Sequence, residues 1–193
     1  MSEIRVDTIS EKTSANGVAI DSVTLKDGGA TLTDNITFSA SGKGVHLGVT
    51  SATSSNLLDD YEEGTFTPTY VGSSGGSVTH VGTIGTYVKV GKIVHVRMRI
   101  MTTAMSLSGD ITITGLPFTS DSTTNYHTIL SNFGVRFNSD MPNLGVYVLN
   151  NVTAATLDKS ASNEIAGSLV QGSDLLNGTN RNILQVQGSY ETS

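Results

Sequence analysis

One stretch, GTYVKVGKIVHVRMRI at residues 85–100, constrains the fold of this 193-residue chain more than any other. Its second half has an apolar residue at every other position: Val94, Val96, Met98 and Ile100. A period of two places alternate side chains on opposite faces of a strand. With Gly91 in its middle, the stretch predicts a β-hairpin that has one buried and one exposed face.

The length of the hairpin loop decides which side chains face each other. A two-residue loop at 91–92 would pair Lys89 with Val94 and mix polar and apolar side chains on each face. A three-residue loop at 91–93 pairs Val90 with Val94 and keeps the apolar side chains on one side. We therefore expect the longer loop, and a pairing of Lys89 with Val94 would contradict it.

Six further runs have the composition of strands and are separated by Gly, Asn and Ser: 65–71, 111–116, 129–137, 144–148, 165–170 and 183–187. In 129–137 we expect Phe133, Val135 and Phe137 on the buried face. Polar stretches at 150–162 and 172–181 are typical of exposed loops. The spacing of the runs predicts an all-β fold, with residues 65–193 forming an antiparallel, jelly-roll-like β-sandwich.

Residues 16–53 carry pairs of apolar residues that are separated by turn residues. Two-stranded pieces this small are marginal alone in water. Three copies around one axis would bury these side chains, so we predict a short intertwined β-shaft in a homotrimer. A flexible Gly/Ser/Thr linker is the alternative. Residues 54–64 combine capping and acidic residues with Gly64, which predicts a helical hinge of one or two turns.

Composition excludes several classes of function. The net charge is -6 and Lys and Arg form no cluster, so we expect no nucleic-acid binding. No run approaches the roughly 20 apolar residues of a membrane span, and we expect synthesis in the cytoplasm without membrane insertion. The absence of Cys excludes disulfides and thiol chemistry. Scattered His and isolated carboxylates give no metal site and no catalytic pair, so we expect no enzyme and no cofactor.

Five segments resemble tail-fibre and related virion proteins of bacteriophages, especially those of aquatic bacteria: SEIRVDTISEKTSANGV at 2–18, VTLKDGG at 23–29, LLDDYEEGTFTPTY at 57–70, GTYVKVGKIVHVRMRI at 85–100 and ITGLPF at 113–118. The resemblance extends to about residue 118. It implies a homotrimeric fibre in the virion, made in the host cytoplasm, whose residues 1–15 attach to another virion protein. The implied attachment residues are Ile4, Arg5, Val6, Thr8 and Ile9.

The resemblance also implies that the C-terminal domain faces outward and recognises host-surface polysaccharide or protein. Aromatic rings can stack on sugars and amides can bond hydroxyls, and this directs attention to one set of residues: Asn125, Tyr126, His127, Asn150 and Asn151. Tyr126 could equally cover the rim of the sandwich. A structural role without a receptor, as a capsid decoration or cement protein or a head fibre, is the alternative function.

Overall fold

The computed structural model describes residues 34–123, 127–138, 143–160 and 167–193. The attachment residues expected at 4–9 and residues 16–33 of the expected shaft lie outside these ranges. Within them the chain forms β-strands and two short 3₁₀ turns, η1 at Ser54–Asn56 and η2 at Gly172–Asp174, which confirms the all-β prediction. No helix in the described part of the chain is long and apolar enough to cross a membrane.

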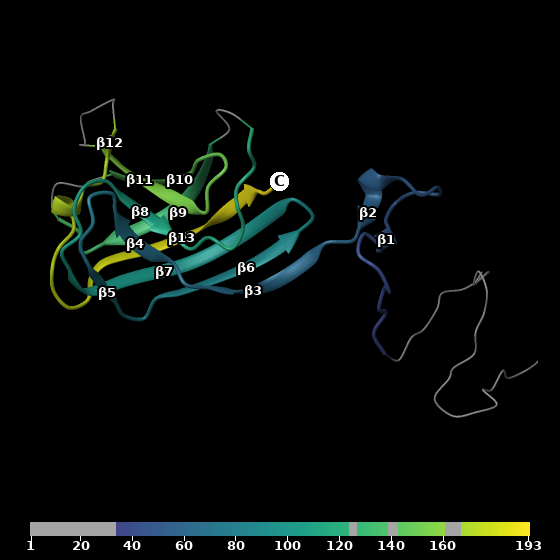
Figure 1. Ribbon diagram of the computed structural model, residues 1–193, viewed down its shortest axis with the longest axis horizontal. Helices are drawn as coiled ribbons and strands as arrows, with labels where there is room; N and C mark the ends of the chain where they lie inside the picture. Colours follow the sequence, from purple (N-terminus) through teal and green to yellow (C-terminus); the bar gives the residue numbers. More distant parts are fainter. Residues whose placement is uncertain (1–33, 124–126, 139–142, 161–166) are drawn as a thin grey trace, which may run out of the picture. The chain divides into compact units, whose positions relative to one another are not determined.

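Eleven strands form one antiparallel sheet (Figure 1). Nine of them follow each other across the sheet in the order β3 (Tyr61–Phe66), β6 (Ile84–Val90), β7 (Ile93–Met105), β13 (Arg181–Glu191), β9 (Thr128–Val135), β10 (Asn143–Val148), β11 (Ala154–Ser160), β8 (Ile111–Thr114) and β4 (Thr69–Gly72). Two short strands lie off this path: β5 (Val78–His80) pairs with β7, and β12 (Ser168–Leu169) pairs with β11.

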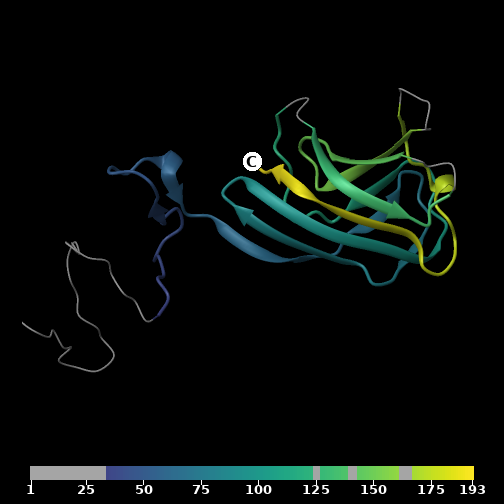
Figure 2. The same ribbon diagram turned by 180° about the vertical axis from the view of Figure 1, so that it is seen from behind.

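The sheet curls so that its β8–β11–β10 side lies over β7 and β13 (Figures 1 and 2). Two buried hydroxyls bond across the enclosed space. Tyr70 of β4 donates to the carbonyl oxygen of Asn182 at 3.2 Å, and Tyr190 of β13 donates to that of Phe118 at 2.9 Å. A single curled sheet therefore replaces the predicted sandwich of two sheets. The physical reason is β13, which pairs with β7 on one side and β9 on the other and so joins the two layers.

Strand β7 is the longest strand and the centre of the core. One edge pairs first with β6 and then with β5, while the other edge pairs with β13. Its inward side chains include the four predicted from the period of two, and these are almost completely buried: Val94, Val96, Met98 and Ile100. They pack with apolar side chains from β4, β8, β9, β10, β11 and β13.

The predicted hairpin loop is wrong. Lys89 pairs with Val94 and Val90 pairs with Ile93, so the loop has two residues. Gly91 occupies its first position with a φ of 56°, a conformation that glycine adopts without strain. As a result Val88 and Val90 point away from the core, whereas Tyr87 and Lys89 point inward.

The inward Lys89 is buried, with its charge paired to Asp60. Its ammonium group also lies 5.5 Å from the centre of the Phe118 ring, and Phe118 packs against the core. Tyr87 meets the same ring edge-on and donates its hydroxyl proton to Glu62. Long amphipathic side chains can cover apolar surface with their stems while their polar ends reach a partner. The edge of the core therefore accepts a lysine that a strict apolar pattern would exclude.

The predicted helical hinge is present only as η1. Residues 57–58 form β2 (Leu57–Leu58), which pairs with β1 (Val45–His46), and β3 already begins at Tyr61. Gly64 does not end a helix: it pairs with Tyr87 inside the sheet, where an added Cβ would lie 2.8 Å from the tyrosine hydroxyl oxygen. Side chains of the preceding segment, such as Ile36 and Leu47, are exposed within one chain.

Strand β11 lies in the stretch 150–162 that we expected to be a loop. Its residues Asp158 and Lys159 rarely favour strands, but Ala155 and Leu157 are completely buried. Pairing with β10 on one edge and β8 on the other stabilises the strand. Tertiary contacts therefore outweigh its intrinsic preference.

Candidate functional site

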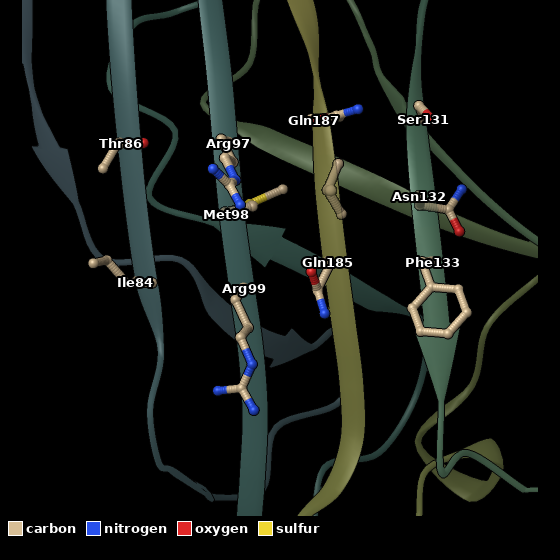
Figure 3. A pocket seen from close by; sticks show the side chains of 11 residues that line it. Ile84, Thr86, Arg97, Met98, Arg99, Ser131, Asn132, Phe133, Gln185 and Gln187 are labelled. Atoms are coloured by element: carbon tan, nitrogen blue, oxygen red, sulfur yellow. The ribbon is translucent and has the colours of Figure 1, made fainter.

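A groove of about 430 Å³ crosses the outward face of four neighbouring strands, β6, β7, β13 and β9 (Figure 3). Its floor contains the backbone around two residues whose side chains belong mainly to the core, Met98 and Val186. Its volume lies in the range of pockets that bind small molecules, roughly 300–1,000 Å³. The groove is open, so a ligand could extend beyond it along the sheet.

Strand register places the groove side chains in two parallel rows. In one row Arg97 pairs with Thr86 and Gln187, and Gln187 pairs with Ser131. In the other row Arg99 pairs with Ile84 and Gln185, and Gln185 pairs with Phe133. Directly opposed side chains in a sheet lie about 5 Å apart, and rows on one face about 7 Å apart. Each row is therefore a continuous line of side chains.

The alternating sequence of two strands creates this face. In β7 the basic residues occupy the positions between the buried apolar ones, and in β13 Gln185 and Gln187 flank the buried Val186. Burial of the apolar set fixes the register, which in turn fixes the outward direction of the polar set. The core thus holds the groove residues on rigid strands.

A second sequence prediction, that Phe133 lies on the buried face, is wrong. We expected its side chain in the core, but it is 61% exposed in the groove, and Leu130 is the buried residue of β9. Both sets of alternate positions in β9 contain large apolar residues, since Ile129 is also exposed. The pattern alone therefore does not select the inward face. The structure thus places an exposed aromatic ring beside amides and guanidinium groups in the groove.

The two arginines differ in their contacts. Arg99 donates to the carbonyl oxygen of Gly82 at 2.8 Å and to the sulfur of Met101 at 3.4 Å, so it partly anchors the loop before β6. Arg97 is exposed and makes no hydrogen bond or ion pair with any residue in the described ranges. Its guanidinium donors are therefore available to a ligand.

The residues predicted for receptor binding lie elsewhere. Asn125 and Tyr126 fall outside the described residues. His127 is exposed at the start of β9, and its ring stacks on that of Tyr147 with 6.0 Å between centroids. Thr128 pairs with Val148, so His127 and the turn at 150–151 lie at the same end of the sheet. Their role in receptor binding stays a prediction.

That end of the sheet is where the chain enters β3. Asp121 connects two segments at this end of the sheet. Its amide donates to the carbonyl oxygen of Glu191, and its carbonyl oxygen accepts from the amide of Asn151 at 3.0 Å. Asn151 has a φ of 56°, which Asn tolerates better than most residues. The hairpin loop lies at this end too, since the amide of Thr192 donates to the carbonyl oxygen of Lys92. We call this end of the sheet, where the chain enters β3, the entry end.

A second, shallower pocket of about 410 Å³ lies at the opposite end of β7. Its lining is rich in hydroxyl and amide groups from 105–109 and 171–177, and Gln171 donates to the carboxylate of Asp110 at 2.5 Å beside it. The polar side chains here mostly bond each other or the backbone, as Ser106 does with Ser77. The pocket is therefore a less available ligand site than the groove.

The described residues contain no cluster of three or more His, Asp or Glu side chains that could hold a metal ion. Alternation with Val96, Met98 and Ile100 implies that Arg97 and Arg99 face outward, but it does not connect them with Gln185, Gln187 or Phe133. The signal was present in the alternation of each strand. The pairing of β7 with β13, nearly ninety positions apart in the chain, was needed to bring them together.

No protein-family model matches the chain, and no curated protein matches it in sequence. Among solved structures it is similar to the crystal structure of Dettilon tailspike protein (gp208), with a TM-score of 0.50 and 20% sequence identity. The similarity covers 68% of this chain and 24% of that chain, so this chain corresponds to about a quarter of the tailspike's length. At this identity the two proteins share a fold.

Proposed function

We propose that this chain is a bacteriophage virion protein of the tail-fibre kind, whose β-domain binds the surface of the host cell. The observation that supports it most is the fold shared with a tailspike protein, found independently of the sequence motifs that resemble tail-fibre proteins. Virion location and host recognition follow from this assignment. The N-terminal residues would attach the protein to another virion component.

The groove on the outward face of β6, β7, β13 and β9 is the surface we assign to recognition. It presents an exposed aromatic ring, two arginines and several amides on strands that the core holds in place. Binding residues positioned on rigid elements lose little freedom when a ligand binds. In this proposal the protein binds its receptor without cleaving it, and the described residues that line the groove include no carboxylate.

The protein acts as a homotrimer in this proposal. An apolar row of Tyr61, Val90 and Ile93 crosses β3, β6 and β7 at the entry end, with each side chain at least 45% exposed. The segment that precedes it also exposes apolar side chains, such as Ile36 and Leu58. Contact with sister chains would remove both sets of side chains from water. Contacts of the apolar row and contacts of the preceding segment would then stabilise the same trimer.

Adsorption to bacterial cells tests the function. Labelled full-length protein should bind saturably to the strains that the parent phage infects, and excess unlabelled protein should reduce infection of those strains. Binding to fibre-less or undecorated capsids without binding to any cell would instead favour the structural role. Release of sugar from cell-surface glycan by the pure protein would contradict the proposal that it does not cleave its receptor.

A further inference from the structure

We propose that the groove binds an acidic glycan, a polysaccharide segment that carries carboxylate groups, through Arg97 and Arg99, with Phe133 as a stacking surface. This inference rests on the proposed host-surface function and names the chemical class of the receptor. It follows from the charge, the free donors and the shape of the groove.

The described lining of the groove carries two positive charges in a protein with a net charge of -6, and Glu63 lines a neighbouring pocket together with Thr86 and Arg97. The chain has 17 acidic and 11 basic residues, yet no Asp or Glu is among the described residues that line the groove. Arg97 and Arg99 lie two positions apart on one strand, so their guanidinium groups start from the same face about 7 Å apart. Local potential, and not net charge, decides which ligand a groove attracts.

The donors match a carboxylate better than a neutral sugar. Arg97 has no partner in the described part of the chain, and a guanidinium can donate two parallel hydrogen bonds to one carboxylate. Arg99 contributes its charge while its contacts with Gly82 and Met101 hold it in place. The side chain of Arg97 can therefore move to bond the ligand, while that of Arg99 stays in place beside it.

The rest of the groove suits sugar rings. One face of a pyranose ring consists largely of C–H groups, which pack on an exposed aromatic ring such as that of Phe133. Gln185 and Gln187 offer amides that both donate to and accept from hydroxyl groups. The lining crosses four strands, a width of about 14 Å, so a short oligosaccharide fits better than a single sugar.

Two other occupants fit less well. A sister chain placed with the same face against this groove would bring arginines toward arginines, and such like-charge contacts oppose association. Nucleic acid carries a phosphate at every step, and tight binding requires many more cations than these two. A glycan with spaced carboxylates matches the number of charges in the groove.

The test measures binding of oligogalacturonate to the full-length protein by calorimetry, with dextran oligomers of similar length as the neutral probe. We expect saturable binding of oligogalacturonate, weaker binding as salt rises from about 0.05 to 0.5 M, and no binding of dextran. Arg97→Gln should weaken binding at least tenfold. The matched control is Lys92→Gln, which removes one positive charge from the hairpin loop outside the groove and should leave binding unchanged.

Each outcome has one meaning. Equal binding by wild type and Arg97→Gln, equal loss in the Lys92→Gln control, or equal binding of dextran would overturn the acidic-glycan site. Cell adsorption that persists when oligogalacturonate does not bind would overturn this inference and leave the proposed function intact. Absence of adsorption to every strain would overturn the proposed function itself. Melting temperatures of both variants within about 2 °C of the wild type would exclude misfolding as the cause.

Discussion

The inward and outward faces of strands β7 and β13 are built from alternate residues of the same segments but differ in every physical respect. Inward residues such as Ile100 and Leu184 are completely buried, whereas their neighbours Arg99 and Gln185 line an open groove. The inward face forms the core, and the outward face carries polar groups, of which Arg99 also bonds the loop before β6. Stability and binding should therefore respond to different substitutions only one residue apart.

The largest expected effect lies on the inward face. Ile100→Ala should lower the free energy of unfolding by about 2–5 kcal/mol, because it removes buried methyl groups from the centre of the core. Arg97→Ala, on the outward face, should change it by no more than about 0.5 kcal/mol. Urea unfolding measures both. A loss of similar size in Arg97→Ala would mean that the groove is part of the structural framework.

The apolar row at the entry end should affect assembly. Val90→Ser with Ile93→Ser should reduce the mass in solution from three times 20.2 kDa toward 20.2 kDa, because the row loses its apolar contact area. Light scattering on a size-exclusion column measures this mass. Ile84→Ser, an exposed apolar residue at the groove, is the control and should keep the mass of the wild type. A monomeric wild type would contradict the proposal that sister chains cover this apolar row.

Phe133 distinguishes recognition from burial. Phe133→Ala should weaken glycan binding about tenfold, close to 1.4 kcal/mol, since the stacking surface is lost. Its melting temperature should stay near that of the wild type, because the ring is mostly exposed. Calorimetry and thermal unfolding of one preparation give both values. Unchanged binding together with a lower melting temperature would assign Phe133 to the structure instead.

The smallest expected effect is on the stability of the fold in acid and involves His80. Burial lowers the pKa of His80, whose Nε2 accepts a hydrogen bond from the amide of Tyr70 at 3.2 Å. Because the pKa of His80 is lower in the folded state than its ordinary value of 6.5, the full contribution of the neutral imidazole to stability is present above pH 6.5. That stability is lost as pH falls below 6.5 toward the folded value, because the unfolded chain takes up the proton first.

Thermal unfolding between pH 7.5 and 5 should therefore show a decline in melting temperature that is shallower in His80→Gln. His95→Gln is the control, since His95 lies exposed on the outward face, with its ring beside the Ser189 hydroxyl. An identical decline in all three proteins would show that His80 does not contribute to acid sensitivity.

The sequence predicted the elements of this fold better than their orientation. Alternation at residues 94–100 of β7 identified four inward residues correctly because all four are apolar. In β6 and β9 both alternate sets contain large apolar residues, so Lys89 was placed outside and Phe133 inside, opposite to the structure. Loop geometry at Gly91 and an ion pair with Asp60 decided the first case, and neither is visible as a hydrophobic pattern.

The candidate site was harder to predict than the fold. Residues that occur close together in the sequence, such as Asn150 and Asn151, drew attention as a receptor site, but the groove combines two or three residues from each of four strands. Only the sheet order β6–β7–β13–β9 places them together. Strand order depends on long-range pairing, which a single sequence does not encode as a local pattern.

Adsorption of the double variant Arg97→Ala/Phe133→Ala to the cells that wild-type protein binds tests the outward face most directly. The variant removes the free guanidinium and the exposed ring together and leaves every inward residue in place. We predict an unchanged melting temperature and loss of saturable adsorption. Adsorption as strong as that of the wild type, by a variant that is equally well folded, would show that the protein recognises its host through another surface.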